Sequence, residues 1–202
     1  MRSSSRKEAP PAWMLDEGAG ALPQLFDGFL QARDKAAVRR IQDSIGKAFA
    51  RLDMMAVEAR HERIGFLASR PDLGPLRRTL LRLRHDLVVI GRTAIQPLPE
   101  ALQGRLGPPL TKVAKAVAEY LRAAGEALVS VQGDVPVAAA AASLDDYAEA
   151  FAAVRREGLT LGLPVETVEC IFTLGFALEQ LRLNLGDLER CVRENARKTG
   201  MD

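Results

Sequence analysis

The amino-acid sequence predicts an all-α protein, an antiparallel bundle of about five helices in which the first, central and last helices are long. In the central stretch 73–95, apolar residues recur every seven residues in two rows, which only a helix brings to one side. The rows are Leu73, Leu80, Leu87 and Ala94, and Leu76, Leu83 and Ile90. A similar seam runs from Ile171 to Val192, and we find no strand pattern. Short connections favour antiparallel neighbours.

Composition limits the class of protein. The 202 residues fit one domain, or one domain with a tail, and 48% hydrophobic with 27% charged residues is typical of a globular chain. A formal net charge of +2 is too small for a dedicated nucleic-acid binder. The longest uncharged run, 135–144, is far shorter than the roughly 20 residues of a membrane span. We therefore expect no transmembrane segment in this chain.

The two cysteines, Cys170 and Cys191, belong to the same predicted helix. A straight helix would hold them roughly 30 Å apart, too far for a disulfide. With no signal peptide in view, we interpret both as reduced thiols in a cytosolic compartment.

The N-terminal half is predicted to contain an arm and two helices. Residues 1–21, rich in serine, proline and glycine, are expected to form a flexible N-terminal arm that precedes a single helical-bundle domain, 22–198. One long helix is expected from Pro23 to about Ser69, with a possible interruption within 28–34. The central helix then begins near Leu73 and ends at Gln96, because Pro97 disfavours helical geometry in the preceding residue.

Three further elements follow in the C-terminal half. A proline- and glycine-rich connector, 97–109, precedes a third helix that starts at Leu110 and ends at Gly133 and Asp134. Residues 137–142 are compatible with helix or loop, Ser143 is expected to cap the fourth helix, and Gly158 to end it. Pro164 is expected at the first position of the last helix.

The last helix carries apolar residues on two sides. Phe172, Phe176 and Leu183 form a second row more than about 90° from the main seam, at about 100° per residue. These three residues are therefore candidates for an oligomer interface, or else the helix is interior. Gly91 and Gly175, which lie in and beside the two seams, are expected to admit close approach of a neighbouring helix.

The sequence offers little support for catalysis. Glu58 and His61 have the Glu-x-x-His spacing of di-iron bundles, but the second pair that such a site needs is missing, so a solvated polar face is the simpler interpretation. His85 and Asp86 point about 100° apart on a helix and form no dyad. There is no phosphate-binding loop and no paired-cysteine motif. We predict no enzyme activity, cofactor or metal.

Arginines cluster on the central helix. The arginine stripe, by which we mean Arg78, Arg82, His85 and Arg92, borders an apolar row and is a candidate site for binding an anionic ligand. The simpler interpretation, which we favour, is a set of ion pairs with Glu58, Glu62, Glu179 or Glu189. No aromatic residue for base stacking lies on this helix, so we expect no nucleic-acid partner.

Two segments resemble a known family. LRLRHDLVVIGR (81–92) and IFTLGFALEQLRLNLGDL (171–188) are similar to the cytosolic helical part of the fusaric acid resistance (FUSC) family, bacterial inner-membrane proteins grouped with the aromatic acid exporters. The preceding EARHERIGFLASRPDLGPLRRTL also resembles that family, and the likeness extends over roughly 25–192. In this family a membrane-embedded half precedes a soluble helical half, and the membrane half has no counterpart in this sequence.

The resemblance implies a non-enzymatic domain at the cytoplasmic face of a bacterial inner membrane. It would serve the assembly or regulation of an exporter of aromatic carboxylic acids, with a membrane-embedded transporter half, or itself as a homo-oligomer, as partner. The alternative is a standalone sensor that binds a small carboxylate through the arginine stripe. A phosphate-binding nucleic-acid adaptor is a third hypothesis, against which the near-neutral charge argues.

Overall fold

The structure is a computed structural model of the 202-residue chain, and it describes residues 10–31, 36, 39–44, 46–47, 50, 74–130 and 135–199. It contains the helices α1 (Pro10–Leu30), α3 (Gly74–Thr93), α4 (Glu100–Ser130), α5 (Ala138–Arg156) and α6 (Val165–Thr199). Residues 39–44 are also helical, and no strand occurs in these described ranges. The predicted all-α fold is therefore confirmed.

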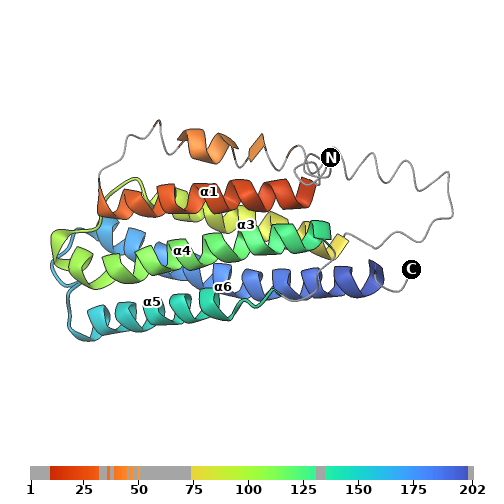
Figure 1. The fold of residues 1–202 in the computed structure, drawn as a ribbon. Helices are drawn as coiled ribbons and strands as arrows, with labels where there is room; N and C mark the ends of the chain where they lie inside the picture. The colour runs from red at the N-terminus through yellow and green to blue at the C-terminus, as the bar shows by residue number, and fades with distance from the viewer. Residues whose placement is uncertain are drawn as a thin grey trace.

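The helices lie along one direction and form an elongated bundle (Figure 1). α1 packs mainly against α4, and α3 packs mainly against α6, in both cases with opposite chain directions. α5 covers α4 and α6, again antiparallel to both. The predicted antiparallel bundle is therefore observed, with α3 and α6 as direct neighbours.

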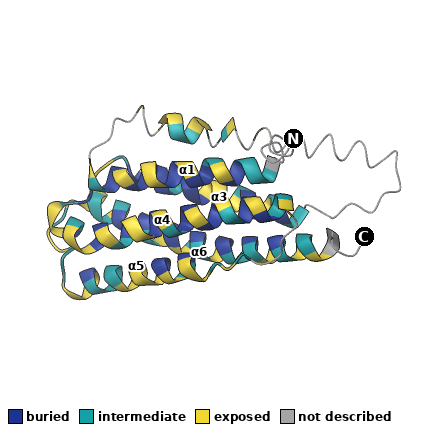
Figure 2. Cartoon of the chain, viewed as in Figure 1, coloured by how far each residue is buried: buried dark blue, intermediate teal, exposed yellow. Residues whose placement is uncertain are grey.

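The core follows the two predicted seams. Buried residues line the sides of the helices that face one another (Figure 2). On α6 the whole predicted seam is at most 2% exposed: Ile171, Leu174, Leu178, Leu181, Leu185, Leu188 and Val192. On α3 the two rows are likewise buried from Leu76 to Ile90. Removal of this apolar surface from water is the main favourable contribution to folding.

The first helix differs from the sequence expectation. Residues 10–21, expected to belong to a flexible arm, form the first half of α1, and Met14, Leu15 and Ala19 are buried against the core. Pro23, expected at the start of a helix, lies inside α1 on its exposed side. Burial of an apolar face outweighs the weak helix propensity of the glycines and prolines. The rest of the expected long helix, 51–69, lies outside the described residues.

The third helix also begins earlier than expected. α4 starts at Glu100 and continues through Pro108 and Pro109, whereas the sequence indicated a connector up to residue 109. Leu102 and Leu106 extend the buried row that continues at Leu110, which favours a helix through this segment. The prolines leave the Gly104 and Arg105 carbonyls without helical partners, and both residues are exposed to solvent.

Other boundaries agree in part. α3 ends at Thr93, three residues before the expected Gln96. Ser143 is no cap, because α5 begins at Ala138 in an alanine-rich run and the Ser143 hydroxyl donates to the Ala140 carbonyl at 2.7 Å.

Gly158 ends α5 as predicted, in a left-handed conformation (φ 68°). Pro164 precedes the first residue of α6. Gly133 and Asp134, the expected end of the third helix, lie outside the described residues.

Among the described helices, none has the length and apolarity that a membrane span requires.

Candidate functional site

The arginine stripe lies on an exposed side of α3. Arg78, Arg82, His85 and Arg92 are all exposed. The Arg82 guanidinium donates to Asp187 Oδ2 of α6 at 2.6 Å and to Thr79 Oγ1 at 3.2 Å. Arg82 therefore makes an interhelical ion pair, as the simpler interpretation expected, but its partner Asp187 is not one of the four glutamates expected from the sequence. Of the partners it did name, Glu58 and Glu62 lie outside the described residues.

The second apolar row of α6 is exposed over much of its length. The exposed fractions are 41% for Phe172, 67% for Phe176 and 52% for Leu183. Val165 extends the same row by seven residues toward the N-terminus of the helix, and it is also exposed. We call Val165, Phe172, Phe176 and Leu183 the α6 stripe. It lies opposite the buried seam, so α6 is not interior on this side.

Phe172 is the residue of the α6 stripe whose side chain is partly covered by residues of α5. Its ring meets Phe151 edge to face with centroids 5.4 Å apart, and the Arg155 guanidinium lies 5.4 Å from its centroid. Gly175 allows this contact, because a Cβ at that position would lie 3.1 Å from the Phe151 ring. A Cβ at Gly91 would lie 2.9 Å from Gln42 and 3.2 Å from Leu25. Both glycines therefore permit close packing, as predicted.

Polar side chains also join α3 and α6 inside the bundle. Asp86 is buried, and the Asn184 amide donates to its carboxyl oxygen at 2.6 Å. Burial raises the pKa of Asp86 from 3.8 to about 6, against the opposing effects of the Asn184 hydrogen bond, His85 and Arg82. Asp86 was expected to form no dyad with His85, and its pairing with Asn184 was not predicted from the sequence. Its position between Leu83 and Ile90, within the buried side of α3, was the available signal.

Both cysteines are free and contact α3. The Cys170 thiol donates to the Thr93 carbonyl at 3.2 Å, and Cys191 Sγ lies 3.9 Å from Thr79 Oγ1. Burial raises the pKa of each thiol. Because the thiolate is the reactive form, this environment disfavours nucleophilic chemistry at either sulfur.

Two buried tyrosines of the core have different hydrogen bonding. Tyr120 donates to the Leu185 carbonyl at 3.2 Å, whereas the buried Tyr147 hydroxyl has no hydrogen-bond partner among the residues that the structure describes. Burial raises the pKa of both phenols, so each stays neutral.

Tyr147→Phe should therefore raise the free energy of unfolding by about 1 kcal/mol, while Tyr120→Phe should lower it by a similar amount. Urea unfolding of the two variants tests this, and a loss of stability in Tyr147→Phe would contradict it.

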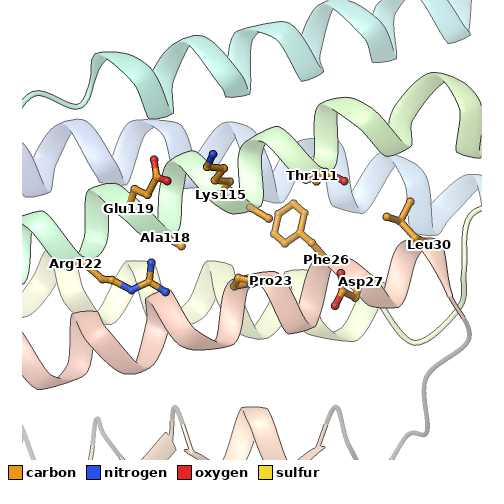
Figure 3. A pocket seen from close by; sticks show the side chains of 10 residues that line it. Pro23, Phe26, Asp27, Leu30, Thr111, Lys115, Ala118, Glu119 and Arg122 are labelled. Atoms are coloured by element: carbon orange, nitrogen blue, oxygen red, sulfur yellow. The ribbon is translucent and has the colours of Figure 1, made fainter.

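A groove of about 220 Å³ opens between α1 and α4 (Figure 3). Phe26 extends from α1 toward α4 in its middle. The residues that line it are Pro23, Phe26, Asp27, Leu30, Thr111, Ala114, Lys115, Ala118, Glu119 and Arg122. Its two acidic and two basic residues balance, so it offers no net attraction for an anion. None of the residues predicted for ligand binding lines it.

No metal site occurs in the ranges that the structure describes, since they hold no group of three His, Cys, Asp or Glu side chains able to bind an ion. The Glu58 and His61 pair lies outside those ranges.

Comparisons of the chain with models of protein families, with curated proteins and with solved structures found no match. The resemblance to the FUSC family therefore stays a prediction.

Proposed function

We propose that this chain is a non-enzymatic helical domain that serves the assembly of a membrane-embedded exporter of aromatic carboxylic acids. The observation that carries the proposal is the α6 stripe, which places two phenylalanines and two aliphatic residues in one exposed row. Contiguous exposed apolar surface of this kind marks interaction sites, because leaving it in water is unfavourable. The exporter class comes from the resemblance of 81–92 and 171–188 to the FUSC family.

The carboxylate sensor is less well supported. The arginine stripe lies on an exposed helix side, and Arg82 is already engaged with Asp187. Small-ligand sites are concave and largely apolar, which favours burial of an aromatic ring. The groove of about 220 Å³ lies between α1 and α4 instead. We therefore place the function in an interface rather than in a ligand pocket.

Growth of a deletion strain of the source organism on fusaric acid tests this function. We expect loss of the chain to sensitise cells to the acid, and the wild-type chain to restore tolerance. Phe176→Ser should fail to restore it, because it removes apolar surface from the middle of the α6 stripe, whereas Phe176→Leu should succeed. Equal levels of folded protein are checked for both variants. Unchanged tolerance in the deletion strain would refute the proposal.

A further inference from the structure

The arginine stripe and the α6 stripe meet on one side of the bundle. The exposed ion pair between Arg82 and Asp187 joins them across the contact between α3 and α6. Arg78 lies four residues before Arg82, and Leu183 lies four residues before Asp187, so each is the surface neighbour of its ion-pair residue. We call the exposed residues of α3 and α6 on this side the α3/α6 face.

The two halves of the α3/α6 face differ in charge. Every exposed charged residue of α3 is basic, because its one acidic residue, Asp86, is buried. On α6, residues 165–181 contain three glutamates and no lysine or arginine. Glu179 from this stretch is exposed between Phe176 and Leu183 of the α6 stripe. The face therefore has a basic half on α3 beside a part of α6, residues 165–181, that is acidic and apolar; beyond it, the exposed Arg190 pairs with Asp187.

The register between the helices shows which residues lie at the same level. Arg82 contacts Asp187 and Asp86 contacts Asn184, and these two pairs fix the register between the helices. Because the helices are antiparallel and each rises by about 1.5 Å per residue, each step forward along α3 corresponds to one step backward along α6. Six residues beyond Asp86, Arg92 reaches the level of Leu178, next to Glu179. Arg92 lies about 120° around α3 from Asp86, and Glu179 about 140° around α6 from Asn184, at 100° per residue. Both side chains therefore point away from the contact within one copy.

We propose that a second copy of this chain docks on the α3/α6 face, through a two-fold axis that runs between α3 and α6 and parallel to them. This rotation lays α3 of each copy on α6 of the other, as a closed isologous dimer requires. It brings Arg92 of one copy to the level of Leu178, next to Glu179, of the second. It also brings Val89 to the level of Leu181, within two residues of Leu183 of the α6 stripe, and the two-fold axis repeats both contacts. The charge complementarity lies within one face, which identifies a second copy as the occupant. The inference rests on the proposed function in its use of the α6 stripe.

Charge reversal with sedimentation equilibrium of the purified full chain tests the arrangement. Arg92→Glu and Glu179→Arg each place like charges at both contacts of the dimer, so we expect each to raise the dimer Kd at least tenfold. When the two variants are mixed, the heterodimer again has opposite charges at both contacts, and its Kd should return to the wild-type range. Glu126→Arg, on the exposed side of α4, is the matched control and should leave Kd unchanged.

Three results would overturn the inference: a wild-type chain that stays monomeric up to millimolar concentration, single variants that dimerise like the wild type, or a mixture that fails to dimerise. Thermal unfolding of each variant verifies that it is folded. The growth assay separates this inference from the proposed function. A monomeric chain that still restores tolerance to fusaric acid would refute the dimer and leave the exporter role standing.

Discussion

Replacement of Asp86 by asparagine is expected to stabilise the chain at pH 7.5 but not at pH 4. The folded state raises the pKa of this buried carboxyl from 3.8 to about 6. Between these values the folded chain binds more protons than the unfolded chain, so the free energy of unfolding falls as pH rises through this window. About two pKa units correspond to a loss on the order of 3 kcal/mol. Asp86→Asn removes this loss and keeps an oxygen that accepts from Asn184.

Urea unfolding of the wild type and Asp86→Asn at several pH values measures this effect as a difference in stability that grows from pH 4 to pH 7. Other titrating groups cancel in the difference. Asp146→Asn on α5 is the control, because this exposed carboxylate makes only a surface ion pair with Lys112, worth about 0–1 kcal/mol. A difference for Asp86→Asn that is constant with pH would contradict the raised pKa.

Asn184→Ala gives a second view of the same pair. It removes the amide that donates to Asp86 at 2.6 Å. A buried carboxylate that loses its hydrogen-bond donor lowers the free energy of unfolding by about 1–3 kcal/mol or more. The protonated acid lowers it by less, because it carries no charge. The variant should therefore lose more stability at pH 7.5 than at pH 4.

Gly28→Ala is expected to lower the free energy of unfolding by roughly 1–3 kcal/mol. A Cβ at Gly28 would lie 2.5 Å from the Ala94 carbonyl oxygen and 3.3 Å from the Ala94 Cβ. The obstacle is backbone, so α1 would have to shift away from the end of α3. That shift also strains the hydrogen bond between the Leu98 amide and the Phe29 carbonyl, 2.8 Å long.

The same helix supplies a matched control in Gly20. It is exposed, and a Cβ there meets nothing within 4 Å. Gly20→Ala should therefore stabilise the chain by up to about 1 kcal/mol through helix propensity alone. Thermal unfolding of both variants, each compared with the wild type, measures the two effects. The same sign for both would show that the close approach of α1 to Ala94 is not a constraint.

The sequence was most informative where the apolar period was uninterrupted. The seams of α3 and α6 predicted their buried sides residue by residue, because helix geometry alone decides which side chains share a side. The period was harder to read in α1 and at the start of α4. In these two segments the prolines and glycines led us to expect an arm and a connector instead of helix, although Leu15, Leu22 and Phe29 recur every seven residues along α1. Their burial against other helices decided the outcome.

The candidate site shows the same division. By itself the sequence determined that the arginine stripe shares one side of its helix and that Phe172, Phe176 and Leu183 share one side of theirs. Only the tertiary structure decided that these helices are neighbours and that Asp187 pairs with Arg82, since the ion-pair partners are 105 residues apart in the chain. The buried contact of Asp86 with Asn184, 98 residues away, was decided in the same way. Helical periodicity is local, whereas the choice of packing partner depends on how all the apolar sides are buried together.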